Sequence, residues 1–173
     1  MVTKLQSRSS LRRRIDLRPR LYLLSALLVI AALCAASAAS SADQGQFSKS
    51  GVVQNAVDGD TVDVRLTNGR RERVRLIGID TPELRPAECL GTQAKLRAQQ
   101  LARGKRVQLI GDSTQATRDR YRRLLAYVVL PRNRDLGRQL IAEGFGNVYV
   151  YNRPFQRLSA YRSAELSAKT GDR

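Results

Sequence analysis

Hydrophobic and polar residues alternate in the central part of this chain. Between residues 61 and 67, every second residue is a valine or a leucine, which is the period of a strand with one buried face. Asp58-Gly59 and Asn68-Gly69 flank this segment, and such dipeptides favour tight hairpin turns. The pattern predicts three consecutive antiparallel strands, over residues 51–57, 61–67 and 71–79.

Beyond Pro82, which should end the sheet, the spacing of apolar residues becomes helical. Leu90, Ala94, Ala98 and Leu101 recur at intervals of four, four and three residues, which places them on one face of a helix. A glycine at position 104 supplies a helix stop. A helix is therefore predicted over residues 90–103, covering one face of the sheet.

The rest of the chain adds two strands and two helices. Two short apolar runs fit a fourth and a fifth strand. An apolar repeat up to Gly144 predicts a second helix, and Asn152 with Pro154 predicts the start of a third. Strands first, with helices inserted and appended, indicate an α+β fold. These predicted elements are the strands 107–110 and 124–130 and the helices 136–144 and 152–168.

The N-terminal part has the pattern of an export signal. Five arginines between residues 12 and 20 precede an apolar run at 21–36, and small residues follow, as in a signal peptide with its cleavage site. We expect an exported protein, secreted or periplasmic after cleavage; the alternative is a membrane anchor formed by residues 21–36. The predicted organisation is a signal peptide or anchor at 1–42, a disordered leader at 43–50, a folded domain at 51–168 and a tail at 169–173.

The charge of the chain is strongly basic. The sequence has 31 basic and 15 acidic residues, a net charge of +16, and the part from Asp43 onward still carries +10. Such a surface attracts polyanions, so nucleic acid and anionic membrane surfaces are the leading partners. The alternative is a basic surface that serves only solubility.

Composition also limits the chemistry. The chain has no histidine, which removes the commonest general base and zinc ligand. Any catalysis must therefore come from carboxylates and arginines, with or without a metal ion. Cys34 lies in the apolar N-terminal run and Cys89 is alone in the body of the chain, so the folded part cannot form an internal disulfide.

The first cluster of candidate residues is Asp58-Gly59-Asp60-Thr61. Its simplest interpretation is a hairpin turn. It is not an EF-hand, because the fifth and twelfth positions counted from Asp58 are valine and glycine rather than oxygen ligands. A metal ion here would need ligands from elsewhere in the fold.

The second cluster places Arg75 inside an apolar strand and Asp80 and Glu83 after it. A charge in such a strand is costly unless it is paired, so Arg75 either forms an internal ion pair or binds an anion. The two acids could be turn residues, or they could join Asp60 as oxygen ligands for calcium or magnesium. Because five residues separate Arg75 from Asp80, a bend at Gly78 is required to bring them together.

Two further clusters lie in the C-terminal half. Residues 119–127 place several cations immediately before a strand, where they form either a solvated charge run or the mouth of a site. Tyr149 and Tyr151 are two residues apart. They could stack on nucleic-acid bases or be ordinary half-buried strand residues.

Taken together and in order, these motifs resemble the thermonuclease, or staphylococcal-nuclease-like, family. The resemblance extends over residues 52–168 through DGDT, VRLIGIDTPE, CLG, DRYRRLLAYV and VYVY. It implies an OB-fold, a five-stranded β-barrel with three helices, which agrees with the elements predicted above.

The resemblance also implies roles for individual residues. The carboxylates of Asp60 and Asp80 and the carbonyl of Thr81 would bind Ca²⁺, with Mg²⁺ as the other candidate, and Glu83 would position or deprotonate the attacking water. The family pattern assigns the phosphate to Arg75 and Arg123 and the nucleotide pocket to Tyr121, Tyr149 and Tyr151. One departure is Arg122, which occupies a position where the family usually has glycine.

The expected function is that of a metal-dependent nuclease. It would cleave single- and double-stranded DNA and RNA with little sequence preference, as a monomer without a protein partner. The alternative is a non-catalytic OB-fold nucleic-acid-binding protein, which the basic charge and the tyrosines favour equally. A third interpretation, an envelope protein attached to anionic polymers, leaves the acidic residues unexplained.

Overall fold

The computed structural model describes residues 46–84 and 89–171. In these residues no helix has the length and apolar character needed to cross a bilayer. The predicted signal peptide or anchor lies outside the described residues, as does the first part of the predicted leader. Regular structure begins earlier than residue 51, because Ser48 already pairs with Ile110.

The first three strands form the predicted antiparallel meander. Both turns are fixed by their own side chains: Asp58 accepts a hydrogen bond from the Asp60 backbone N–H at 3.0 Å, and Asn68 accepts one from Arg70 at 3.1 Å. Gly69 has a φ of 83°, which suits its place in a tight turn. These strands are β1 (Ser48–Ala56), β2 (Thr61–Leu66) and β3 (Arg71–Leu76).

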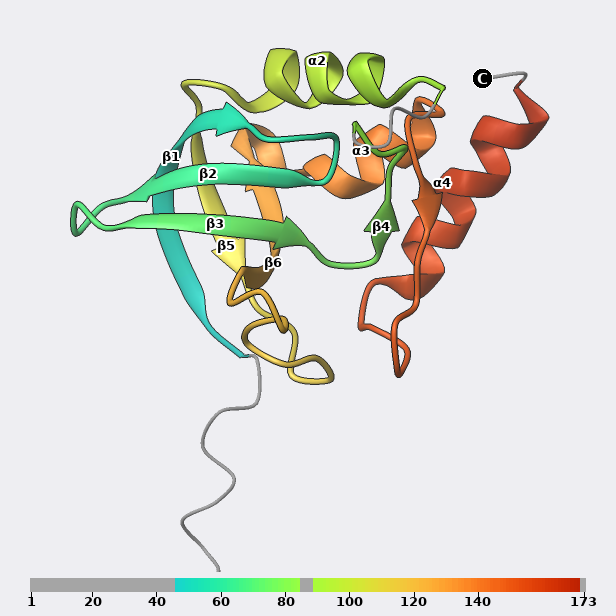
Figure 1. Cartoon of the computed structure of the whole chain (residues 1–173). Coiled ribbons are helices and arrows are strands. Elements are labelled where there is room, and N and C mark those ends of the chain that lie inside the picture. The colour runs from blue at the N-terminus through green and yellow to red at the C-terminus, as the bar shows by residue number, and fades with distance from the viewer. Residues whose placement is uncertain (1–45, 85–88, 172–173) are drawn as a thin grey trace, which may run out of the picture. The chain divides into compact units, whose positions relative to one another are not determined.

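Two later strands, β5 and β6, close the sheet into a barrel (Figure 1). The strand order is β3-β2-β1-β5-β6-β7, and β3 also pairs with β6 in parallel, with Val74 opposite Leu124. In residues 46–84 and 89–171 the result is a closed five-stranded mixed barrel with three α-helices, so the predicted OB-type α+β fold is confirmed. The later strands are β5 (Arg106–Ile110), β6 (Leu124–Leu130), β7 (Arg134–Asp135) and β8 (Asn147–Val148).

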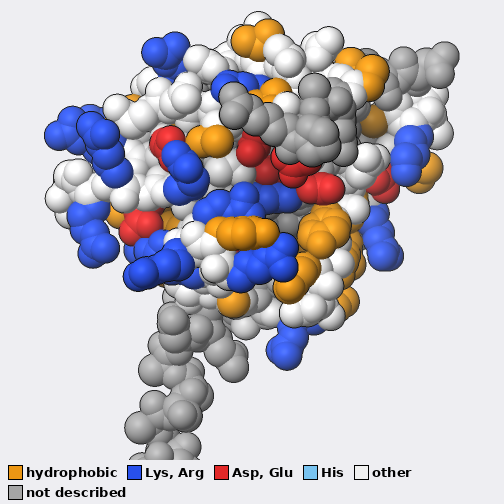
Figure 2. Space-filling view, viewed as in Figure 1, with side chains coloured by type: hydrophobic (Ala, Val, Ile, Leu, Met, Phe, Trp, Pro, Cys, Tyr) orange, Lys and Arg blue, Asp and Glu red, His pale blue; other side chains and the backbone are white. Residues whose placement is uncertain are grey.

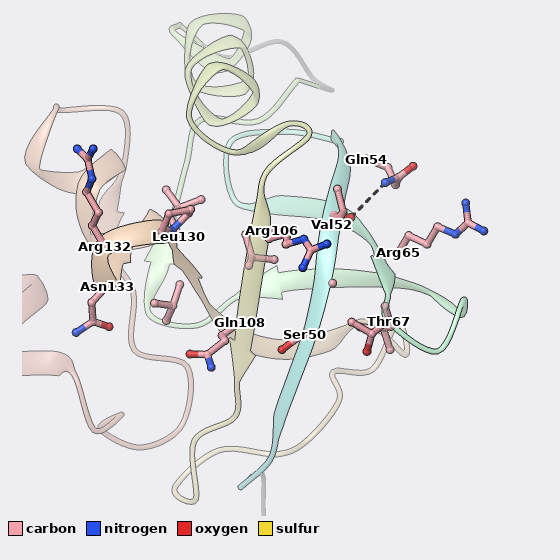
Figure 3. A pocket seen from close by; sticks show the side chains of 15 residues that line it. Ser50, Val52, Gln54, Arg65, Thr67, Arg106, Gln108, Leu130, Arg132 and Asn133 are labelled. Carbon is pink, nitrogen blue, oxygen red and sulfur yellow. Dashed lines mark hydrogen bonds between the residues drawn. The ribbon is translucent and has the colours of Figure 1, made fainter.

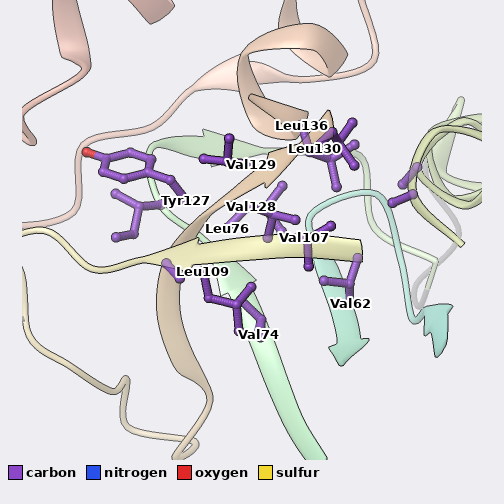
Figure 4. Close-up of a cluster of buried hydrophobic side chains, with 14 of the residues drawn as sticks. Val62, Val74, Leu76, Val107, Leu109, Tyr127, Val128, Val129, Leu130 and Leu136 are labelled. Carbon is purple, nitrogen blue, oxygen red and sulfur yellow. The ribbon is translucent and has the colours of Figure 1, made fainter. Parts of the chain in front are cut away.

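The barrel interior is filled by the apolar positions of the alternating pattern (Figure 4). Val62, Val74, Leu109 and Val128 have no exposed surface, and Tyr127 is 1% exposed. Burying an aliphatic side chain of this size stabilises the fold by roughly 1.5–3 kcal/mol. The core therefore holds the strand ends that carry the polar clusters in fixed positions.

Helices α2 (Gly91–Ala102) and α3 (Leu136–Ala142) match the first two predicted helices closely. Ala94 and Ala98 are fully buried under α2, as the helical spacing predicts. The side chain of Asp135 caps α3 by accepting a hydrogen bond from the Arg138 backbone N–H at 3.2 Å. Between β6 and β7 lies a short 3-10 turn, Pro131–Asn133.

The third helix, α4 (Leu158–Thr170), differs from the prediction at both ends. It starts well after Asn152 and Pro154, because residues before it are held to the barrel. Phe155 is buried, and the backbone N–H of Gln156 donates to Asp112 Oδ2 at 2.7 Å. At the other end the helix takes up the first two residues of the predicted tail.

Candidate functional site

A sharp bend follows β3 and brings the second cluster together. The predicted strand 71–79 is divided: β3 ends at Leu76, Gly78 turns the chain with a φ of 82°, and β4 (Ile79–Asp80) pairs with β8. Arg75 Nη2 then lies 3.0 Å from Asp80 Oδ1. The bend predicted at Gly78 is confirmed, and it overcomes the odd spacing of the two residues.

Asp60 lies beside them at the start of the second hairpin strand. Its side chain is 6% exposed, and its Oδ2 lies 3.0 Å from Arg75 Nη2. The same oxygen accepts hydrogen bonds from the Thr81 backbone N–H at 3.1 Å and from Thr81 Oγ1 at 3.3 Å. Burial raises the pKa of Asp60 to about 7, even though the charge of Arg75 acts in the opposite direction.

The guanidinium of Arg75 contacts two backbone carbonyl oxygens and two carboxylates. Nη1 donates to the carbonyl oxygens of Ile79 at 2.7 Å and Leu76 at 3.2 Å, and Nη2 contacts both carboxylates. This is the internal ion pair that the sequence allowed. With its side chain 14% exposed, Arg75 still borders solvent on the side of Asp80, which is 54% exposed.

The donor set around Arg75 fits a hard divalent cation. Carboxylate oxygens of Asp60 and Asp80 each lie 3.0 Å from one nitrogen, so they converge on a single small volume. Burial disfavours the charged form of Asp60 more than the charge of Arg75 favours it, so the pKa of Asp60 is raised. Among the described residues no group of three or more acidic or cysteine side chains could hold a metal ion, so further ligands would be backbone carbonyls and solvent.

The second guanidinium, that of Arg123, is fixed by Asp119. Asp119 Oδ2 accepts from Arg123 Nε at 2.6 Å, while its Oδ1 accepts from the backbone N–H groups of Tyr121 and Arg123, both at 2.9 Å. Arg123 Nη1 lies 3.4 Å from Thr61 Oγ1, which in turn donates to Asp60 Oδ1 at 3.1 Å. Thr61 therefore connects Arg123, in the third cluster, to Asp60, in the first cluster.

Sequence reasoning did not identify the positioning parts played by Asp119 and Thr61. Both are visible in the motifs themselves, since Asp119 opens the run of residues 119–127 and Thr61 follows Asp60 directly. An Asp that precedes a turn commonly accepts hydrogen bonds from the backbone of that turn. This signal was available for Asp119.

Arg122 is strained at the position where the resembling family has glycine. Its φ is 65°, in the left-handed region that residues with a Cβ disfavour. Its carbonyl accepts a hydrogen bond from Arg118 Nη1 at 2.8 Å, and its N–H donates to the Asp119 carbonyl at 2.9 Å. The turn therefore keeps its conformation without glycine.

The three predicted tyrosines are exposed, and two of them lie together. Tyr149 and Tyr151 are 45% and 69% exposed, with ring centroids 6.5 Å apart. They follow β8 rather than lying in a longer strand, so the half-buried strand interpretation is wrong. The Tyr149 N–H donates to the Gly78 carbonyl at 3.0 Å, which places this residue beside the bend.

The third tyrosine belongs to the Arg123 turn. Tyr121 is 63% exposed, and its ring lies under the guanidinium groups of Arg120 and Arg123, at 4.8 and 5.2 Å. Such cation–π contacts help to orient the two guanidinium groups. The same turn therefore presents both a cation and an aromatic surface to solvent.

Glu83 lies three residues beyond Asp80, after β4, and its side chain is exposed. The start of α2 packs closely on its backbone: a Cβ added at Gly91 would lie 2.5 Å from the Glu83 carbonyl oxygen. Glycine at position 91 therefore permits this approach. Seen as a surface, this side of the molecule shows acidic side chains beside a band of basic ones, with apolar groups next to both (Figure 2).

Comparison with known sequences agrees with this geometry. A family model described as "Staphylococcal nuclease homologue" matches residues 73–173, which include Arg75, Asp80, Glu83 and Arg123. The match covers more than half of the chain. It begins after Asp60, so the first cluster precedes the matched region.

Several curated relatives are similar over the folded part. Endonuclease YncB of Bacillus subtilis is 35% identical over 123 residues, 68% of this chain and 57% of its own length. The SPbeta prophage-derived endonuclease YokF of the same organism is 36% identical over 68% of this chain and 40% of its own. The thermonuclease of Staphylococcus intermedius is 38% identical over 47% of this chain and 49% of its own. The chain thus spans about half the length of these relatives.

Proposed function

This chain belongs to the staphylococcal nuclease family, and we propose that it hydrolyses phosphodiester bonds in DNA and RNA. The observation that carries the proposal is the convergence of two arginines and two carboxylates from distant segments. Arg75 contacts Asp60 and Asp80 at 3.0 Å, and Arg123 reaches Asp60 through Thr61. The relatives named as endonucleases and thermonuclease support the same activity.

Arg75 and Arg123 supply the phosphate-binding groups in this proposal. A guanidinium donates two parallel hydrogen bonds to phosphate oxygens, and charge that develops on the phosphate in the transition state strengthens these bonds. Asp119 and the carbonyl oxygens of Leu76 and Ile79 hold the two groups in place. Their orientation is therefore set before the substrate binds, which lowers the cost of reaching the transition state.

Glu83 is the proposed general base. It is the exposed carboxylate nearest in sequence to Asp80, and no histidine is present in the chain to take this role. A carboxylate that holds a water by hydrogen bonding can orient it for attack and accept its proton. Glu83 follows Asp80, the last residue of β4, by three residues, which is the sequence observation that supports this role.

Asp60, Asp80 and the carbonyl of Thr81 are the proposed ligands of a calcium ion. When bound, the ion supplies positive charge that polarises the phosphate and offsets its negative charge. The ligand types are those calcium prefers, and magnesium uses the same types with stricter geometry. The support for this assignment is that carboxylate oxygens of Asp60 and Asp80 lie close together, each 3.0 Å from Arg75 Nη2.

The exposed tyrosines give the proposed substrate preference. Base–aromatic stacking is tolerant of sequence, because every base has a flat π-face. Tyr121, Tyr149 and Tyr151 are available for such stacking, so we propose cleavage with little sequence specificity. We further propose that the chain is exported, on the basis of its N-terminal charge and apolar pattern.

A non-catalytic nucleic-acid-binding protein remains the competing function. The exposed tyrosines and basic charge favour it as much as they favour a nuclease. A pure binder, however, needs neither Asp60 nor Asp80, because phosphate binding by itself requires only cations. The buried carboxylate therefore favours the enzyme.

Digestion assays test the proposal directly. The purified chain is incubated with single-stranded DNA, double-stranded DNA and RNA in calcium, in magnesium and with a chelator. We expect cleavage in calcium that stops on chelation. DNA that stays intact in every condition yet is retained by the protein would instead establish the binding protein.

The matched variants are Glu83→Gln and Glu143→Gln. Glu83→Gln keeps size and polarity but removes the base, and we expect turnover to fall by about two to four orders of magnitude while DNA binding persists. Glu143 pairs with Arg97 of α2 at 2.6 Å and has no part in the proposed mechanism, so its variant should keep normal turnover. Full activity of Glu83→Gln would remove Glu83 from the mechanism.

A further inference from the structure

A second basic surface lies on the outside of the barrel, in a groove of about 780 Å³ (Figure 3). Residues of β1, β2, β5 and the turn after β6 line it. In the close-up the side chain of Arg106 extends toward Val52 on β1, and that of Arg65 extends outward beyond it. The lining contains no Asp or Glu.

Strand register places three arginines in one row across this face. Arg71 on β3 is directly opposite Arg65 on β2; Arg65 is opposite Val52 on β1; and Val52 is opposite Arg106 on β5. Directly opposed residues share a face of the sheet. We call Arg71, Arg65 and Arg106 the arginine row. Across three strand intervals it spans about 14 Å.

The arginine row is unfavourable for the fold itself. Like charges directly opposite each other destabilise a sheet, and Arg65 faces Arg71 in this way. In the described part of the chain none of the three has a carboxylate partner, whereas the next arginine along β3, Arg73, pairs with Asp63 at 2.8 Å. A row of uncompensated like charges is stabilised when a polyanion binds.

The turn at one edge of the groove is also strained. Arg132 and Asn133 have φ values of 63° and 54°, so two successive residues with a Cβ lie in the left-handed region. Both line the groove. Such strain often accompanies a binding role. Here the strained turn places a fourth cation, Arg132, and the amide of Asn133 at the edge of the groove.

The outer face of β3 links this groove to the candidate site. Arg71, Arg73 and Arg75 alternate with buried residues along the strand, so they share one face. Arg71 belongs to the arginine row, and Arg75 contacts the two carboxylates. Along β2 the separation from Thr61 in the site to Arg65 in the row is about 13 Å.

We propose that the groove is a secondary binding site for the sugar-phosphate backbone of single-stranded nucleic acid. The arginine row contacts successive phosphates of a strand whose neighbouring segment enters the catalytic cluster. This rests on the proposed function, which makes nucleic acid the polyanion. The apolar floor at Val52 and the amides of Gln54 and Gln108 suit sugar and base edges rather than a fixed sequence.

The test compares two triple variants of the full chain. The row variant is Arg65→Gln, Arg71→Gln and Arg106→Gln; the control is Arg103→Gln, Arg138→Gln and Arg162→Gln, which removes the same charge from exposed positions at the helices. Binding of a labelled 30-nucleotide oligothymidylate is measured with a chelator present, at several salt concentrations. Thermal melting of both variants checks folding.

We expect the row variant to bind at least about tenfold more weakly at low salt, and its plot of log affinity against log salt to lose about 2 units of slope, about 0.7 per lost phosphate contact. The control should lose little affinity. The melting temperature of the row variant should not fall, because opposed like charges have been removed. Equal losses of oligonucleotide affinity in the row variant and the control would overturn the proposal. It would also be overturned if the row variant lost binding to anionic lipid vesicles but bound the oligonucleotide as well as the wild type does.

The two proposals fail separately. A chain that binds oligothymidylate through the arginine row but cleaves no substrate in calcium would refute the nuclease activity and keep the groove. A chain that cleaves DNA while the row and control variants bind alike would refute the groove and keep the nuclease.

Discussion

At the scale of single residues, the backbone conformation of Arg122 leads to a testable prediction about stability. Its φ of 65° is unfavourable for any residue with a Cβ, whereas glycine adopts it without that strain. We expect Arg122→Gly to raise the free energy of unfolding by about 1 kcal/mol, measured by denaturant titration. The gain comes from relief of strain in the turn that fixes Arg123.

The control for this prediction is Arg122→Ala. It removes the same charge and side chain but keeps the Cβ, so it should not gain the stability that glycine gives. Equal stability of the alanine and glycine variants would show that charge, not backbone strain, is what the substitution changes.

Residue patterns alone placed much of the candidate site. A cation in an apolar strand with two acids after it was enough to predict that Arg75 meets Asp80 if the chain bends at Gly78, and this is confirmed at 3.0 Å. The convergence with Asp60 was proposed from chemistry, since no local pattern joins segments 20 residues apart. Thr61 was missed because its role depends on Arg123, which only the folded barrel brings near.

At the scale of elements, the bend between β3 and β4 is the critical connection. Gly78 has a φ of 82°, and a Cβ there would lie 2.4 Å from the ring of Phe155. We expect Gly78→Ala to combine backbone strain with a clash and to lower the free energy of unfolding by about 2–4 kcal/mol. Nuclease activity should fall with it, because Arg75 and Asp80 would separate.

Gly69→Ala is the matched control for the bend. Gly69 has nearly the same φ, 83°, but nothing lies within 4 Å of an added Cβ. Its variant should show only the strain, about 1–2 kcal/mol, and keep its activity. If both variants lose the same stability in urea titrations, the contact with Phe155 is unimportant.

Elements were predictable where local signals were strong. The two Asx-Gly dipeptides fixed the meander, and glycine with helical spacing fixed α2 nearly to the residue. β7 and β8 have two residues each, too few to show a period. The start of α4 was placed too early because the capping preferences of Asn152 and Pro154 are overridden by the long-range contacts of Phe155 and Gln156.

At the scale of the whole molecule, closure of the barrel could not be read from local pattern. The parallel pairing of β3 with β6 joins Val74 to Leu124 across a large separation in sequence. Alternation specifies which face of each strand is buried, and several strand orders satisfy that requirement equally. The family resemblance, not periodicity, supplied the closed topology.

One buried carboxylate connects the barrel to its C-terminal helix. Asp112, with no exposed surface, follows β5. It accepts hydrogen bonds from the Tyr127 hydroxyl in β6, from the Gln156 N–H before α4 at 2.7 Å, and from Thr114 at 2.8 Å. Burial alone would raise the pKa of Asp112, but these hydrogen bonds outweigh burial and lower it below its usual value.

The lowered pKa predicts how whole-molecule stability depends on pH. A carboxylate with a lowered folded pKa contributes stability that is complete above its unfolded pKa of about 3.9 and is lost as the pH falls through the folded value. We expect Asp112→Asn to cost about 2 kcal/mol at pH 7 and the difference from wild type to shrink below about pH 4. Urea titrations at a series of pH values measure this difference.

Tyr127→Phe removes one of the hydrogen bonds to the Asp112 carboxylate and should show part of the same pH dependence, because the Tyr127 hydroxyl stabilises this carboxylate only while the carboxylate is ionised. A difference for Asp112→Asn that stays constant from pH 7 to pH 3 would mean that the bonds joining α4 to the barrel do not depend on this charge.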